Sequence, residues 1–141
     1  MTKQEIDKRV RKAMENHCKG YNCAQSVTCA FSDLAGVDEE TLFKITEGLG
    51  LGMGGMDGTC GAISAAAILS GLTHSTGNLE SPNSKAESYK VSKECMNSFK
   101  EKNGSLICRD LKGVETKKVL RSCNGCIEDA TVIIAESLFS E

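Results

Sequence analysis

The segment GLGLGMGGMDGTCGAISAAAILSGL, residues 48–72, joins a glycine-rich loop to a nearly unbroken apolar run. Seven of the 14 glycines in the chain lie between Gly48 and Gly61, and Cys60 stands where the loop meets the apolar run. Residues 59–72 are apolar almost all round a helix, a pattern typical of a helix buried on every side. The segment therefore predicts a central helix with other elements packed around it.

The loop also matches, in letters, a motif of dinucleotide-binding proteins. Gly50, Gly52 and Gly55 have the G-x-G-x-x-G spacing, but that motif requires a strand before the loop. Residues 38–49 instead have apolar side chains at helical spacing after a typical helix-capping residue. No Gly-Lys-Ser/Thr follows, which argues against a nucleotide P-loop. We interpret the glycines as a bend that holds Cys60, because glycine permits sharp turns and close backbone approach.

The rest of the chain predicts an all-α fold. Apolar residues recur at helical spacing, and no segment shows the sustained alternation expected of a strand. The other expected helices cover residues 2–17, 22–36, 38–49, 84–104 and 122–139. We predict one single-domain bundle, residues 1–141, of six or seven helices, in which a short turn at 105–113 holds another cysteine.

Composition narrows the class of function. The 141 residues suffice to bury roughly two thirds of the unfolded surface, so the fold needs no disulfides. A net charge of −2 argues against a nucleic-acid partner. The N-terminus is unlike a signal peptide, and the longest apolar run, residues 62–69, is too short to cross a membrane. We therefore expect a cytoplasmic protein whose eight cysteines are reduced, some with metal or redox roles.

Four cysteines are expected near helix N-termini. An Asn, Thr or Ser of the capping type directly precedes three of them, and the fourth follows a serine by three residues; they are Cys23, Cys60, Cys123 and Cys108. Unpaired N–H groups and the positive end of the helix dipole favour thiolates there. The thiolate is both the nucleophile and the metal ligand. We predict that these four residues converge on one site.

The remaining cysteines have other surroundings. Cys29 and Cys95 are mid-helix and are expected to pack in the core. Cys18 ends a helix, where the dipole disfavours a thiolate. Cys126 forms a C-x-x-C pair with Cys123, but the βαβ context of thioredoxin-type motifs is missing. Cys126 is therefore a candidate resolving thiol or replacement ligand. The two histidines lack ligand-like spacing and are expected at the surface.

These residues resemble a family of redox-active proteins named for its C…CGAxxG…C…C pattern. The matching stretches are Asn22-Cys23-Ala-Gln, Cys60-Gly-Ala-Ile-Ser-Ala65, Gly-Ser-Leu-Ile-Cys108-Arg-Asp-Leu, and Ser-Cys123 followed by Glu128-Asp129-Ala130. Members are helical proteins of about this length, so the resemblance covers nearly the whole chain. Ala65 replaces the last glycine of the motif, and Cys126 is an extra cysteine.

The resemblance implies a cofactor. A similar domain in split-Soret cytochromes carries an iron–sulfur cluster on cysteines, which implies Cys23, Cys60, Cys108 and Cys123 as ligands and Cys126 as a further cofactor-binding residue. Four thiolates suit an iron–sulfur cluster and also tetrahedral zinc. Haem attachment is not expected without C-x-x-C-H. A redox cofactor near the surface also implies a redox partner protein, and we expect a homodimer.

Two other functions remain open from the sequence. One is a thiol–disulfide redox protein without metal, in which cysteine pairs open and close. The other is a non-catalytic helical binding protein whose cysteines only fill the core. The sequence names no electron donor, acceptor or substrate, and it does not decide whether the protein is an enzyme.

Overall fold

The computed structural model describes residues 1–139, and in that range the chain is all-α with one isolated β-bridge, which confirms the predicted fold class. Its longer helices are α1 (Lys3–Cys18), α2 (Cys23–Cys29), α4 (Glu39–Thr46), α6 (Gly61–His74), α7 (Lys85–Asn103) and α9 (Cys123–Leu138). The shorter ones are α3 (Ser32–Ala35), η1 (Glu47–Leu49), α5 (Gly50–Met53) and α8 (Cys108–Lys112).

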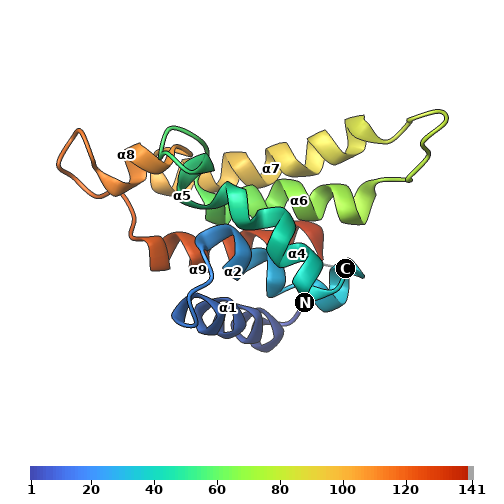
Figure 1. Cartoon of the computed structure of the whole chain (residues 1–141), viewed down its shortest axis with the longest axis horizontal. Coiled ribbons are helices and arrows are strands. Elements are labelled where there is room, and N and C mark those ends of the chain that lie inside the picture. The colour runs from blue at the N-terminus through green and yellow to red at the C-terminus, as the bar shows by residue number, and fades with distance from the viewer. Residues whose placement is uncertain (140–141) are drawn as a thin grey trace.

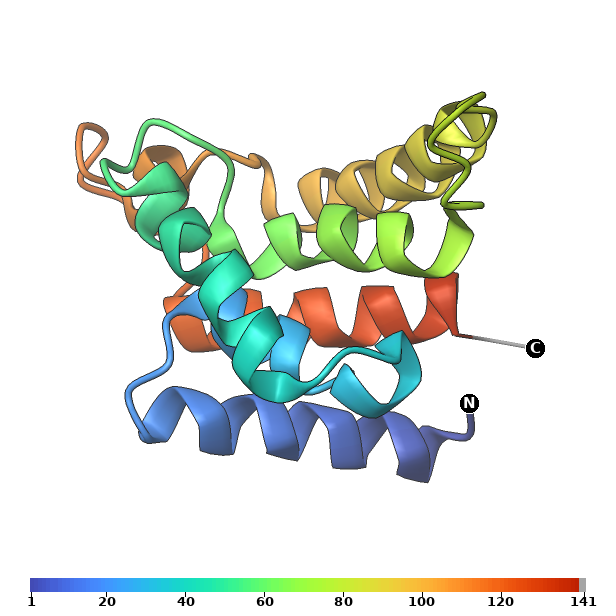
Figure 2. The same ribbon diagram turned by 45° about the vertical axis from the view of Figure 1, so that its right-hand side comes forward.

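Helix α6 lies at the centre of the bundle, as its apolar sequence predicts. Figures 1 and 2 show α6 between α7 on one side and α9 on the other, with α1 beyond α9. Its fully buried side chains are Ala62, Ile63, Ala65, Ala66 and Leu69. Most of them are small, so neighbouring helices approach α6 closely and fill the space around it. Ala65, the residue that departs from the family motif, belongs to this core.

The helix expected over residues 22–36 is interrupted. α2 ends at Cys29 and α3 begins at Ser32, because the backbone of Phe31 leaves the helical region (φ −116°, ψ 15°). The Phe31 ring is fully buried and stacks on Phe139, with 5.2 Å between ring centroids. Aromatic packing of Phe31 on Phe139, the residue that follows α9, therefore accompanies a break that local periodicity does not predict.

A buried carboxylate fastens the start of α9. The Asp129 side chain is 2 % exposed and accepts hydrogen bonds from Lys102 of α7 (2.7 Å) and from Arg121 (3.0 Å), which precedes α9. Burial raises the pKa of Asp129, but the hydrogen bonds from the two cations outweigh it and hold this pKa below its ordinary value. This pairing fixes the segment from which α9 presents its cysteines.

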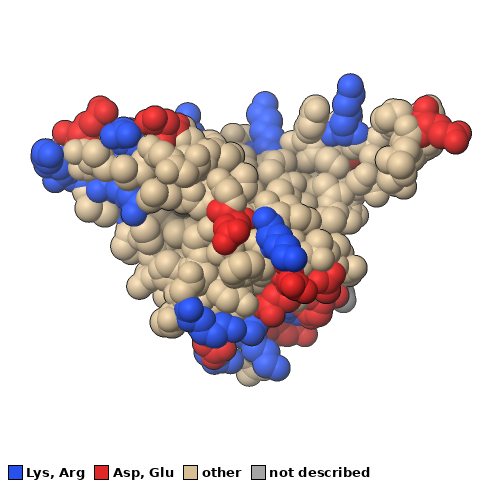
Figure 3. Space-filling model, in the orientation of Figure 1, with Lys and Arg blue, Asp and Glu red and all other residues tan. Residues whose placement is uncertain are grey.

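The face of the molecule in Figure 3 carries charges of both signs, with lysine, arginine and acidic side chains separated by uncharged areas. Among residues 1–139, no helix has both the length and the apolar character needed to cross a membrane.

Candidate functional site

Five of the eight cysteines line one pocket of about 210 Å³ at the N-terminal end of α6. They are Cys23, Cys60, Cys108, Cys123 and Cys126. We call this site the cysteine pocket. The convergence expected from sequence is therefore present, although the cysteines come from four helices that meet at one end of the bundle, on the left in Figure 1. All eight cysteines are free thiols in the structure.

Two of the expected helix caps are present. Asn22 accepts a hydrogen bond from the N–H of Gln25 at 2.9 Å, and Cys23 is the first residue of α2. The hydroxyl of Ser122 accepts from the N–H of Gly125 at 3.0 Å, in the same way, so that Cys123 begins α9. Polar caps fix where these two helices start, and hence where the sulfur atoms lie.

The other two cysteines are held by a backbone pairing. Thr59 and Ile107 form an isolated antiparallel bridge, and Cys60 and Cys108 directly follow its two members, one on each side of the bridge. The N–H groups of both cysteines donate across this pairing, at 2.7 and 3.0 Å. Cys108 begins α8, whereas Cys60 is the N-cap of α6. The expectation that Thr59 caps the helix is therefore wrong, because Thr59 belongs to the bridge.

The glycine-rich loop packs directly against these helix ends. Gly52 has φ +55°, and a β-carbon there would lie 2.5 Å from the β-carbon of Cys108. A β-carbon on Gly61 would lie 3.1 Å from a carbonyl oxygen of η1. Arg109 donates to Asp57 at 3.0 Å and so ties the loop to α8. The glycines therefore permit the close approach that positions the cysteines.

The sulfur atoms of the pocket meet in two pairs. Cys23 and Cys123, the outer pair, are hydrogen-bonded to each other and both partly exposed. Cys60 and Cys126, the inner pair, are also hydrogen-bonded, but their exposed fractions are only 6 % and 2 %. Cys108 lines the same pocket and is buried.

One member of the outer pair is stabilised as a thiolate. The Cys23 thiol donates to the Cys123 sulfur and, with Lys112, lowers the pKa of Cys123 to about 5. The Lys112 ammonium lies 3.3 Å from the Cys123 Sγ. The same hydrogen bond raises the pKa of Cys23, and burial raises it further. At neutral pH the outer pair is thus one thiolate and one thiol.

In the inner pair the pKa values of the two thiols are likewise shifted in opposite directions. The neighbouring Cys126 thiol is the main cause that lowers the pKa of Cys60, and the N–H groups of Ala62 and Ile63 at the start of α6 lower it further. The pKa of Cys126 is raised by its hydrogen bond to Cys60 and by burial. Backbone donors at a helix start, rather than a cation, favour this thiolate.

Helix position alone did not predict which cysteines are thiolates. Cys23 and Cys108 each begin a helix, yet the pKa of both is raised. For Cys23 the main cause is its hydrogen bond to Cys123, and for Cys108 it is burial. A helix N-terminus does not offset the cost of placing several negative sulfurs in one small pocket.

Sequence reasoning missed two ionisable residues that line the pocket, Lys112 and His17. Lys112 follows Cys108 by four residues, a spacing that places both on one face of α8 and that was available as a signal. His17, expected at the surface, is half-buried at the pocket, with its Nδ1 2.9 Å from the Tyr21 carbonyl oxygen. No spacing pattern connected His17 with the cysteines, because the contact is formed by the return of α1 onto α9.

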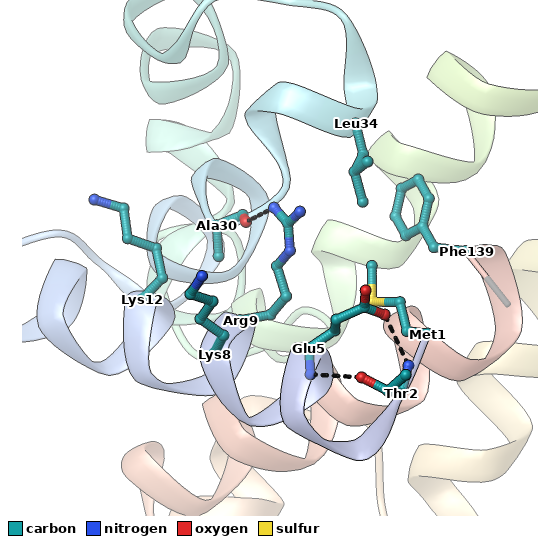
Figure 4. A pocket seen from close by; sticks show the side chains of 9 residues that line it. All are labelled: Met1, Thr2, Glu5, Lys8, Arg9, Lys12, Ala30, Leu34 and Phe139. Carbon is teal, nitrogen blue, oxygen red and sulfur yellow. Dashed lines mark hydrogen bonds between the residues drawn. The ribbon is translucent and has the colours of Figure 1, made fainter.

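A wider cavity of about 940 Å³ lies beside the N-terminal half of α1 and contains no cysteine. Figure 4 shows Lys8, Arg9 and Lys12 along one side of it and Leu34 and Phe139 along another. Arg9 donates to the Ala30 carbonyl oxygen at 2.9 Å and also binds Asp33. The lining of this cavity therefore combines cationic and apolar side chains and has no thiol that could react.

The described residues contain no ready-made site for a single metal ion. Between residues 1 and 139, no three His, Cys, Asp or Glu side chains are arranged to hold one ion. In the cysteine pocket the sulfurs lie in two separate pairs, the outer pair and the inner pair. A tetrahedral zinc site would need four ligands directed at one point.

Comparison with known proteins identifies one family. Residues 21–137 match the model of a family described as "Putative redox-active protein (C_GCAxxG_C_C)", and the match includes all five cysteines of the pocket. No curated protein matches the chain, and no solved structure matches it.

Proposed function

We propose, from the premise that this chain belongs to the C_GCAxxG_C_C family of redox-active proteins, that its cysteine pocket exchanges electrons by thiol–disulfide chemistry. Membership confirms the family resemblance noted in the sequence. The outer pair is the observation that supports the chemistry. A partly exposed thiolate, Cys123, accepts a hydrogen bond from a thiol, Cys23. An attacking thiolate beside a resolving thiol is the arrangement that disulfide exchange requires.

The proposed reaction is balanced between the outer pair and a disulfide of a partner. The Cys123 thiolate attacks one partner sulfur, forms a mixed disulfide and releases the other partner sulfur as a thiolate. Cys23 loses its proton to that thiolate and attacks the Cys123 Sγ, which releases the first partner sulfur. The result is a Cys23–Cys123 disulfide and a reduced partner, so two electrons have passed to the partner.

A trapping experiment tests this function. In the double variant Cys23→Ser, Cys126→Ala no neighbouring thiol can resolve the first attack, so glutathione disulfide is expected to leave a stable glutathione adduct on Cys123. Peptide-resolved mass spectrometry locates the adduct. Cys95→Ala is the matched control, because it removes a fully buried thiol outside the pocket and leaves the outer pair able to close. Absence of an adduct on Cys123 would contradict the proposal.

A second candidate function is the binding of an iron–sulfur cluster. It is supported by the gathering of five cysteines from four helices around one cavity. The donor set fits, because such a cluster is bound through separate irons and its cysteines need not point at one atom. Cys23, Cys60, Cys108 and Cys123 would hold the cluster, with Cys126 as a further ligand, and the cluster would supply one-electron transfer. Zinc is the other metal that thiolates suit, but only if the pocket rearranges.

Anaerobic purification tests the cofactor. Visible absorbance together with iron and sulfide assays reports a cluster directly, and metal analysis reports zinc. We expect Cys60→Ser to abolish any binding and Cys29→Ala to preserve it, since Cys29 lies in the core beside α4. Colourless, metal-free protein from strictly anaerobic cells would contradict this second function and leave the thiol chemistry unaffected.

We also propose a cytoplasmic homodimer that exchanges electrons with another protein. The eight free thiols suit a reducing compartment. Two apolar side chains beside the cysteine pocket, Leu51 and Met53, are 47 % and 55 % exposed, which supports protein docking near the pocket. Light scattering that shows a strict monomer at high concentration would contradict the dimer.

A further inference from the structure

We infer that Cys126, the cysteine additional to the four-cysteine pattern, gives the pocket a second and buried dithiol, and that this inner pair exchanges electrons with partners only through the outer pair. The inference rests on the proposed thiol–disulfide function. It adds a residue and a route to that function. The pocket would then store four electrons, two in each pair.

The inner pair differs from the other buried cysteines in having sulfur next to sulfur. Cys60 and Cys126 are 6 % and 2 % exposed and lie next to each other, and the Cys126 thiol also faces the Arg121 carbonyl oxygen at 4.0 Å. Cys29 is just as buried and faces the Glu39 carbonyl oxygen at 3.8 Å, but no cysteine is among the groups that shift its pKa. Burial therefore does not by itself produce a dithiol. The fold places this particular pair in contact while excluding solvent from both sulfurs.

Cys123 connects the two pairs. It is the first residue of α9 and Cys126 is the fourth, a spacing that puts both on one face of the helix. Both side chains line the cysteine pocket, and Cys123 also contacts Cys23. Cys123 is therefore the one outer cysteine that shares a helix with a member of the inner pair, and it is partly exposed.

The exchange between the pairs balances without any further reagent. Starting from a Cys60–Cys126 disulfide, the Cys123 thiolate attacks the Cys126 Sγ and releases Cys60 as a thiolate. Cys23 then passes its proton to Cys60 and attacks the Cys123 Sγ, which releases Cys126 as a thiolate. The Cys60–Cys126 bond has broken and the Cys23–Cys123 bond has formed, so two electrons have moved from the outer to the inner pair.

Counting disulfides tests the second dithiol. The protein is oxidised with glutathione disulfide, its free thiols are blocked in denaturant, and its disulfides are mapped by mass spectrometry. Wild-type protein is expected to contain two linkages, Cys23–Cys123 and Cys60–Cys126. Cys126→Ala is expected to retain only the first, while the control Cys95→Ala retains both. A wild-type protein with Cys60 and Cys126 still free after the outer pair has closed would overturn the inference.

Two variants test the route. The double variant Cys23→Ser, Cys60→Ser is expected to accumulate a Cys123–Cys126 linkage, because neither thiol that could break this bond remains. Cys123→Ser is expected to slow formation of the Cys60–Cys126 linkage by roughly tenfold or more, since buried sulfurs then react only through local opening. Unchanged circular dichroism establishes that each variant is folded. Oxidation of the inner pair at the wild-type rate in Cys123→Ser would overturn the route.

The proposed function and the second dithiol can be contradicted separately. If the outer pair does not oxidise in wild-type protein, the proposed function is wrong. If the outer pair oxidises and the inner pair does not, only the second dithiol is wrong.

Discussion

The cysteine pocket and the hydrophobic core hold the same residue type in two chemical states. In the core, burial raises the pKa of Cys29 to about 11, and burial also raises the pKa of Cys95. In the pocket, a hydrogen bond from Cys23 and the nearby Lys112 lower the pKa of Cys123 to about 5. Cys60 is as buried as a core residue, yet its pKa is lowered as well. A neighbouring donor, rather than exposure alone, therefore decides which sulfur is reactive.

Alkylation at pH 7 is expected to reveal the largest difference between the two regions. Cys123 is almost entirely thiolate at that pH, whereas only about one Cys29 in 10⁴ is ionised. The lower intrinsic nucleophilicity of a low-pKa thiolate reduces this advantage, and burial of Cys29 restores part of it. We expect Cys123 to react about a hundredfold faster with iodoacetamide, as measured by peptide-resolved mass spectrometry.

The pH dependence sharpens the same comparison. Because the pKa of Cys123 is lowered, its reactivity should persist down to about pH 5 and fall below it. The reactivity of Cys29 should instead still be rising above pH 9, since its pKa is raised. Equal rates for the two cysteines, or parallel pH profiles, would show that the pocket does not activate Cys123.

Stability is expected to depend on the core far more than on the pocket thiols. Phe99 is fully buried, so Phe99→Ala should lower the free energy of unfolding by about 3–5 kcal/mol. Cys123→Ser changes one atom of a partly exposed side chain and should cost less than about 1 kcal/mol. Urea denaturation measures both. A loss on Cys123→Ser as large as that on Phe99→Ala would mean that the outer pair is part of the structural core.

The glycine loop offers a matched pair of variants. Gly52 and Gly54 both have positive φ, +55° and +87°, but only a side chain at Gly52 would meet Cys108. Gly54→Ala should therefore cost about 1 kcal/mol for backbone strain alone. Gly52→Ala should cost about 2–3 kcal/mol, because the overlap adds to the strain. Denaturant midpoints give both values, and equal losses would mean that the loop does not hold Cys108.

The smallest expected effect concerns Lys112. In Lys112→Met the nearby positive charge is lost, so the pKa of Cys123 should rise by about 1 while the hydrogen bond from Cys23 continues to lower it. Ultraviolet absorbance of the thiolate, recorded against pH, measures the change. Lys118→Met, at an exposed position outside the pocket, is the control. An unchanged pKa of Cys123 in Lys112→Met would mean that Lys112 does not stabilise the Cys123 thiolate.

The linked effect on stability has a definite sign. The folded-state pKa of Cys123 lies below its ordinary value of 9.0, so the thiolate contributes stability that is fully present above that value and is lost as pH falls through about 5. In Lys112→Met part of this stability should be missing at high pH.

The fold class could be predicted from the sequence, because apolar periodicity and helix-capping residues are properties of short stretches of chain. The apolar run of α6 and the capping residues Asn22 and Ser122 predicted a central helix and two of the cysteine-bearing helix starts. The pairing of sulfurs was not predictable, because it depends on how α2, α6 and α9 cross in space. The bridge between Thr59 and Ile107 is likewise a contact between distant segments. Local capping rules consequently placed Cys60 one position too far into its helix.

The sequence predicted which cysteines form the candidate site, but it did not predict which of them have a lowered pKa. Capping signals and the family resemblance pointed to all four converging cysteines, and C-x-x-C spacing pointed to Cys126. The thiolate states depend on hydrogen bonds across the pocket, so treating each helix start separately assigned Cys23 and Cys108 wrongly. Lys112 was not predicted as a pocket residue, but it could have been, because it follows Cys108 by four residues, about one helical turn.

A redox titration of the wild-type protein against the glutathione couple tests the central claim most directly. The readout is the Cys23–Cys123 linkage, located by peptide mass spectrometry after free thiols are blocked. We predict that the linkage forms as the couple becomes oxidising and disappears on reduction, while Cys29 and Cys95 remain blocked as thiols throughout. Cys23 and Cys123 that remain free at every potential, or core cysteines that oxidise together with them, would contradict the account.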